Sequence, residues 1–252
     1  MAALADVLGL TEGAALYAFF AVFLAGVVRG FSGFALSALA MASLVFVLPP
    51  VQIIVICLVL EATATVLMTR RGFGQADKRM VFGLILGVGI GAPIGLAITT
   101  SVTEETSRVV ALGMILSLAA AQLSGARPAF LATRPGLLGS GAAAGVVQGA
   151  AASGGMVVAL YALARQAPAA VMRDSLVFYL TLSIATNAVF YAIFGVMTVE
   201  ILLKGAALAL PAGVGVLVGA RLFSPRLQPY YRPICLWILI GLAAFGLLQA
   251  LL

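Results

Sequence analysis

Ten apolar segments, joined by short polar connections, fill almost the whole sequence. Of the 252 residues, 63% are hydrophobic and only 9% are charged, whereas soluble globular domains carry roughly 25% charged residues. The mean hydropathy is +1.21. Because so few ionisable side chains cannot cover the surface of a water-soluble particle, the sequence predicts an integral membrane protein.

The apolar segments predict helices and not β-strands. A strand of a membrane barrel alternates apolar and polar residues, and no such alternation is present. The expected fold class is therefore an all-α integral membrane protein. The segments lie near residues 14–29, 33–48, 51–69, 80–99 and 106–124 in a first set, and near 136–150, 155–165, 170–195, 199–222 and 230–252 in a second.

The two sets resemble each other. The stretches 25–30 (AGVVRG) and 144–149 (AGVVQG) match at an offset of 119 residues. Further pairs follow in the same order: Ser32-Gly33 with Ser153-Gly154, Pro49 with Pro168, Gly91-x-x-x-Gly95 with Gly215-x-x-x-Gly219, and Ser101 with Ser224. Such an ordered series predicts an internal duplication, with repeats at residues 1–125 and 126–252.

The charges of the connections predict opposite orientations for the two repeats. Lys and Arg gather in cytoplasmic loops. The connection 70–79 carries four of them, whereas its counterpart 196–200 carries Glu200 and no base. An odd number of crossings per repeat also inverts the second copy. We therefore expect an inverted 5+5 arrangement with both termini outside and the connections 124–135 and 165–173 in the cytoplasm.

The first two segments of each repeat look short for a membrane crossing. The eleven residues of 155–165 reach about 17 Å as a helix, against a hydrocarbon core of roughly 30 Å. Each pair either crosses twice or forms a hairpin that turns back near the midplane. Irregular backbone survives at that depth only where protein or a water-filled cavity surrounds it, and inverted-repeat transporters place their substrate sites there.

The turns between these short segments contain the residues that we expect to bind a small anion. Glycine lets a helix break, and the next helix then begins with free N–H groups and its positive dipole end at the break. Hydroxyl and amide groups add donors, and an arginine adds charge. The candidates are Arg29, Gly30, Phe31, Ser32 and Gly33 in the first repeat and Gln148, Gly149, Ser153, Gly154 and Gly155 in the second.

These candidates also have structural explanations. Small residues at helical spacing allow close packing of membrane helices, and we expect that role for the glycine pairs 91/95 and 215/219. Arg29 has a second interpretation as a side chain that snorkels to the cytoplasmic interface, if the first two segments cross the membrane fully.

Glu61 is the one acidic residue near the centre of a long apolar segment. A charged carboxylate there costs several kcal/mol, so it is protonated, paired, or exposed to an aqueous path. The functional interpretation is a group that couples transport to protons, and the alternative is a protonated structural glutamate. Thr63 and Asn187 are expected to add polar lining.

Several chemistries are disfavoured by the residue types present. Histidine is absent, and Cys57 and Cys235 are far apart in apolar runs, so we expect no metal site, no disulfide and no cofactor. An intramembrane enzyme would need histidine, paired carboxylates or an activated nucleophile. The basic residues form no stripe that would favour nucleic acid, and no ATP-binding GxxxxGK[ST] loop is present.

The glycine and proline spacings resemble the sulfite exporter TauE/SafE family over nearly the whole chain. The residues that carry the resemblance are Gly26-x-x-x-Gly30-x-x-Gly33, Gly145-x-x-x-Gly149 with Ser153-Gly154-Gly155, and Pro49 with Pro168. The resemblance implies a carrier of the bacterial inner membrane for sulfite or short organosulfonates such as sulfoacetate.

Together these observations predict a secondary transporter of a small sulfur-containing anion that works by alternating access, with proton coupling through Glu61. A passive anion channel and a non-transporting membrane scaffold are the alternatives. The expected partners are the anion and the lipid bilayer, without nucleic acid, and a homodimer is left open.

Overall fold

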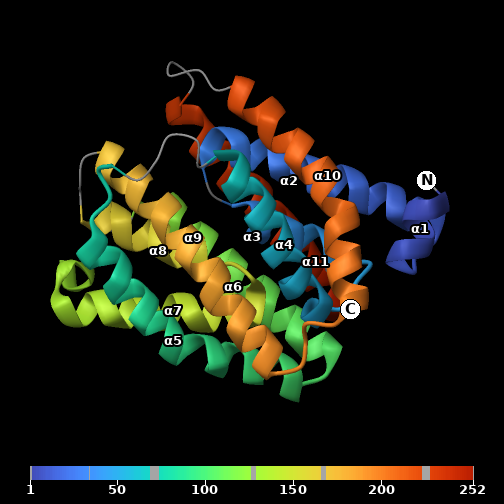
Figure 1. The fold of residues 1–252 in the computed structure, drawn as a ribbon, viewed down its shortest axis with the longest axis horizontal. Coiled ribbons are helices and arrows are strands. Elements are labelled where there is room, and N and C mark those ends of the chain that lie inside the picture. The colour runs from blue at the N-terminus through green and yellow to red at the C-terminus, as the bar shows by residue number, and fades with distance from the viewer. Residues whose placement is uncertain are drawn as a thin grey trace.

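The computed structural model describes residues 2–33, 35–68, 74–125, 129–165, 169–222 and 228–251, and all regular structure in these ranges is helical. Pro168 and Ser224, two of the residues matched between the repeats, lie outside these ranges. The helices are α1 (Ala2–Leu8), α2 (Glu12–Ser32), α3 (Leu36–Leu44), α4 (Pro50–Met68), α5 (Lys78–Ser101), α6 (Glu104–Leu123), η2 (Ala129–Ala132), α7 (Arg134–Ala151), α8 (Gly154–Ala164), α9 (Ala169–Ile193), α10 (Val199–Leu222) and α11 (Gln228–Leu251) (Figure 1).

The ten expected segments correspond in order to helices α2 to α11, whereas α1 and η2 were not expected. Within the described residues, seven helices are long and apolar enough to cross a membrane: α2, α4, α5, α6, α9, α10 and α11. The prediction of a multi-pass, all-α membrane protein is therefore confirmed.

The expectation that two segments of each half are short needs correction for the first half. Helix α2 has 21 residues, about 31 Å, and is one of the seven candidate spans. Helix α7 has 18 residues, about 27 Å, and is not among those spans, and α3 and α8 have only 9 and 11 residues. Helix α2 exceeds its apolar segment because Thr11 caps it by accepting a hydrogen bond from the Ala14 N–H, and because it continues past Arg29, whose charge is buried and paired.

Each short helix follows a break in the chain. Helix α2 ends at Gly33 with φ +81°, and Ala35, which precedes α3, has φ +76°. Helix α7 ends at Ala152 with φ +53°. A left-handed conformation costs a non-glycine residue roughly 1–2 kcal/mol, so the surrounding packing must hold Ala35 and Ala152 in place.

Two seams of glycine join the halves of the chain, residues 1–125 and 126–252. Helix α2 packs along α10, and α5 packs along α7; Figure 1 shows each pair side by side. In the first seam Gly26 and Gly30 of α2 lie against the backbone of α10. In the second, Gly91 and Gly95 of α5 lie against the backbone of α7. Each seam thus pairs a helix of one half with a helix of the other.

The seams predict how substitutions on α5 affect stability. Gly91→Ala should lower the free energy of unfolding by about 1–3 kcal/mol, the usual cost of overpacking, because the added Cβ would collide with the carbonyl group of Ala142. Gly89→Ala on the same helix is the matched control, since its Cβ would meet no atom within 4 Å. Unfolding in mixed micelles, followed by the fluorescence of Trp237, measures the stability of both variants. Equal losses of stability in the two variants would contradict close packing of Gly91 against α7.

Candidate functional site

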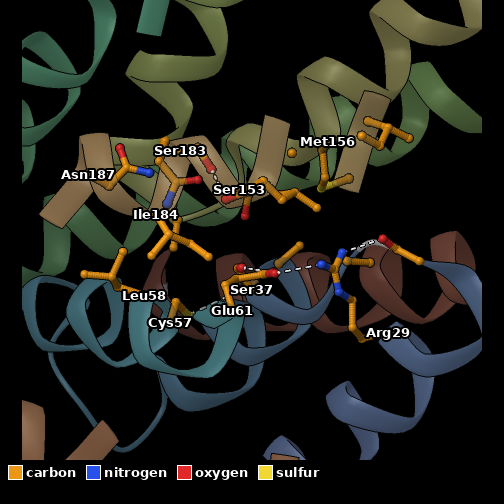
Figure 2. A pocket seen from close by; sticks show the side chains of 18 residues that line it. Arg29, Ser37, Cys57, Leu58, Glu61, Ser153, Met156, Ser183, Ile184 and Asn187 are labelled. Atoms are coloured by element: carbon orange, nitrogen blue, oxygen red, sulfur yellow. Dashed lines mark hydrogen bonds and ion pairs between the residues drawn. The ribbon is translucent and has the colours of Figure 1, made fainter. Parts of the chain in front are cut away.

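A cavity of about 30 Å³ lies between the two breaks, with room for about two water molecules. One wall comes from helices α2, α3 and α4 of the first half, and the other from α7, α8 and α9 of the second. Figure 2 shows the two walls facing each other, with Arg29, Ser37 and Glu61 on one and Ser153, Ser183 and Asn187 on the other.

The first wall contains a buried ion pair. Arg29 Nη2 lies 3.2 Å from Glu61 Oε2, and the two side chains are only 2% and 13% exposed. Ser37 Oγ donates a hydrogen bond of 2.6 Å to Glu61 Oε1. Arg29 Nη1 donates to the carbonyl oxygen of Gly33. The pair therefore connects the break after α2 with the middle of α4, where Glu61 is the twelfth of 19 residues.

Arg29 is buried at the end of its helix. It lies in the last turn of α2, where a cation complements the negative end of the helix dipole. Its side chain is only 2% exposed and turns toward Glu61. Arg29 Nε is buried and has no hydrogen-bond partner among the described residues, which leaves one donor of the guanidinium available.

The start of α3 already has an anion beside it. Ala35 precedes the helix and makes no side-chain capping bond, and the first N–H groups of a helix have no partner within it. Ser37, the second residue of α3, holds the Glu61 carboxylate at this end. A carboxylate at a helix N-terminus is stabilised by the dipole.

In the second half a neutral residue, Gln148, bridges the break. Gln148 Oε1 accepts a hydrogen bond of 3.1 Å from the Gly154 N–H, and its Nε2 donates to Tyr191 Oη at 3.4 Å. Ser153 precedes α8 but does not cap it, because its hydroxyl donates to the carbonyl oxygen of Ala151 at 2.7 Å. Gln148 and Arg29, which match in the sequence, thus both span a break.

Helix α9 completes the second wall with uncharged polar groups. Ser183 Oγ donates to the carbonyl oxygen of Leu180 at 3.0 Å. Asn187 is only 2% exposed, and its Oδ1 is buried without a hydrogen-bond partner in the described part of the chain. A buried amide oxygen without a partner costs about 1–3 kcal/mol, so Asn187 is a polar group that a ligand in the cavity could satisfy.

The structure brings most of the predicted residues together and separates some of them from the cavity. The predicted residues that line it are Arg29, Gly33, Glu61, Gln148, Ser153, Gly155 and Asn187. Ser32 ends α2, and its side chain lies outside the described part of the structure. Ser37 and Cys57 also line the cavity but were not predicted. A serine in the first turn after a break is a signal that could have identified Ser37.

The predicted residues that do not line the cavity take part in packing. Gly30 faces α10 at Val216, and Gly149 faces α5 at Leu96. Phe31 packs against the hydrophobic core. Gly154 lies tightly against Ala144 and Gln148 of α7. Thr63 donates to the carbonyl oxygen of Val59 within α4.

The family model for the sulfite exporter TauE/SafE family matches residues 18–246. The chain belongs to this family. Members of the TauE/SafE family are membrane transporters of sulfur-containing anions and are not enzymes. A search of curated proteins found no match, and a search of solved structures found none either. The residues matched include every residue that lines the cavity of this TauE/SafE transporter.

The buried ion pair predicts non-additive losses of stability. Arg29→Gln and Glu61→Gln should each lower the free energy of unfolding by about 3–5 kcal/mol, because each leaves an uncompensated buried charge. The double variant should lose less than the sum, since it removes both charges. Arg165→Gln is the control: its ion pair with Asp77, at 3.4 Å, is about one-third exposed, so the loss should stay below about 1 kcal/mol. Additive losses for Arg29 and Glu61 would show that the two side chains do not interact.

Proposed function

We propose that this TauE/SafE protein is a secondary transporter that moves sulfite or a short organosulfonate across the bacterial inner membrane by alternating access, coupled to protons through Glu61. The observation that carries the proposal is the small cavity between two helix breaks, which is lined by one buried cation, one carboxylate and several neutral donors.

The cavity has the donors that an oxyanion requires. The N-termini of α3 and α8 both open into it, and helix N-termini bind anions through free N–H groups and the dipole. Arg29 adds a charge and an unused Nε donor. Gln148 and Ser153 add neutral groups that need no counter-charge.

Charge balance supports a role for Glu61 in proton coupling. Arg29 and Glu61 neutralise each other in the cavity. An arriving anion competes for Arg29, and the released carboxylate would then be a buried, unpaired charge, which costs several kcal/mol. Uptake of one proton by Glu61 removes that cost, so one monovalent anion and one proton would cross together without net charge.

The position of α9 supports the inverted orientation of the two repeats. At its start, Asp174 Oδ2 accepts a hydrogen bond of 3.0 Å from the Gln75 N–H, and Ser175 Oγ accepts one of 2.8 Å from the Asp77 N–H. At its other end follows the connection 194–198. The 20 residues from Asp174 to Ile193 separate these connections by about 30 Å, which is about the thickness of the hydrocarbon core. We therefore propose that 74–77 lies in the cytoplasm, as the basic residues of 70–79 indicate, and that 194–198 and both termini lie outside.

A flux measurement tests transport and proton coupling together. Purified protein in liposomes should take up labelled sulfite, sulfoacetate or taurine, and a pH gradient should drive accumulation. Glu61→Gln should lose the gradient-driven accumulation and keep downhill exchange, because a glutamine binds no proton. Gly89→Ala, on the open face of α5, is the folded control and should behave as the wild type.

Three results would contradict the proposal in different ways. Absence of flux for every sulfur anion tested would remove the transport function. Flux that ignores the pH gradient would favour a passive anion channel. Full accumulation by Glu61→Gln would assign proton coupling to another group.

Cysteine labelling tests the inverted topology. In a background of Cys57→Ala and Cys235→Ala, a membrane-impermeant maleimide should label Thr198→Cys on intact spheroplasts, and should label Gln75→Cys only after permeabilisation. Both positions are exposed, so access depends on the side of the membrane alone. Labelling of both from the same side would mean that the repeats are oriented alike.

A further inference from the structure

The two helix breaks offer unequal places for an anion. Both α3 and α8 begin at the cavity, and neither N-cap residue, Ala35 or Ser153, makes a side-chain capping bond. If the two halves were identical, the N-termini of α3 and α8 would form two equal anion sites. The side chains that surround the two ends differ in charge, however, and this difference assigns them different roles.

The place at α3 is occupied by the chain itself. Glu61 Oε1 accepts the Ser37 hydroxyl bond at 2.6 Å, and Glu61 Oε2 lies 3.2 Å from Arg29 Nη2. These are the contacts that an oxyanion would make at this helix end. The Glu61 carboxylate therefore occupies the position at the N-terminus of α3 where the first half would otherwise bind a substrate anion.

The place at α8 has no such internal anion. The one acidic residue in the sequence of α9 is Asp174, and it bonds to the Gln75 N–H at the start of that helix. The α9 residues that line the cavity beside α8 are uncharged, with Ser183 and Asn187 as the polar ones. Among the described residues, the side-chain oxygen that accepts a hydrogen bond at the positive end of α8 is that of the neutral Gln148.

Asn187 is the second feature that marks this place. The residue is only 2% exposed. It lines the cavity, and its Oδ1 has no hydrogen-bond partner among the described residues. Figure 2 shows it on the second wall beside Ser183 and Ile184. An amide offers one acceptor and two donors, and the assignment of its oxygen and nitrogen interchanges on a 180° rotation. Asn187 can thus present an N–H to an oxyanion or its oxygen to a protonated one.

We propose that the transported anion binds at the second break only, at the N-terminus of α8, with Asn187 as the residue that determines its recognition, while Glu61 occupies the matching place at α3 as a built-in anion. This inference rests on the proposed transport function and narrows it to one sulfonate or sulfite group per chain. Arg29, which pairs with the built-in anion, lines the same cavity and is the cation that the transported anion would share with it.

Binding measurements on the full-length protein in nanodiscs test the assignment. The probe is methanesulfonate, titrated by calorimetry, with uncharged dimethyl sulfone as the control ligand. Asn187→Leu, of similar size, should weaken methanesulfonate binding about tenfold or more, the loss expected for one hydrogen bond to a charged group. Asn187→Asp should abolish it through like-charge repulsion. Thr186→Val is the matched control on the same helix, because Thr186 bonds to the carbonyl oxygen of Leu182 and does not line the cavity; it should bind as the wild type.

Glu61→Gln separates the two places. Removal of the built-in anion leaves Arg29 free for the ligand, so this variant should bind methanesulfonate at least as tightly as the wild type. Wild-type affinity in Asn187→Leu, or loss of binding in Glu61→Gln protein that is still folded by its Trp237 fluorescence, would overturn the inference and leave the transport function standing. Absence of binding and of flux in the wild type would instead overturn the transport function and the inference together.

Discussion

Close backbone contact along two glycine seams sets the positions of everything else in this structure. In lipid there is no hydrophobic gain when two apolar helices associate, so their stability depends on van der Waals packing at short range. Gly26 and Gly30 bring α2 onto α10, and the glycines of α5 and α7 do the same in the other seam. Because each seam crosses between the halves, the ends of α2 and α7 meet at one cavity.

The same short motif builds the seam and the site. Successive residues of a helix point about 100° apart, so when Gly30 faces α10 its neighbour Arg29 points elsewhere. Arg29 turns to Glu61, and Gln148, the neighbour of Gly149, turns to Gly154. The match between VVRG and VVQG therefore encodes both a packing contact and a side chain that spans the break.

Much of the fold follows from the sequence, because apolar length and charge alone decide which segments can lie in lipid. The sequence predicted the ten segments and the packing role of Gly91. It also singled out Arg29 and Glu61 as charged residues within apolar segments. The role of Gly30 was not, because a glycine serves equally well at a break and at a seam, and only the neighbouring helix decides between them. The Arg29–Glu61 pair joins different helices, so no spacing in the chain predicts it. The length of α2 was underestimated for the same reason. An arginine indicates the end of an apolar segment unless a partner that neutralises its charge is known.

The seams also impose an order on biosynthesis. Helix α5 meets α7 soon after it enters the membrane, because only α6 and η2 separate them in the chain. Helix α2 is made before α10, and helices α3 to α9 lie between them in the chain. Until α10 has entered the membrane, the glycine face of α2 lacks the partner that it has in the folded structure. The contact between α2 and α10 therefore forms later in synthesis than the contact between α5 and α7.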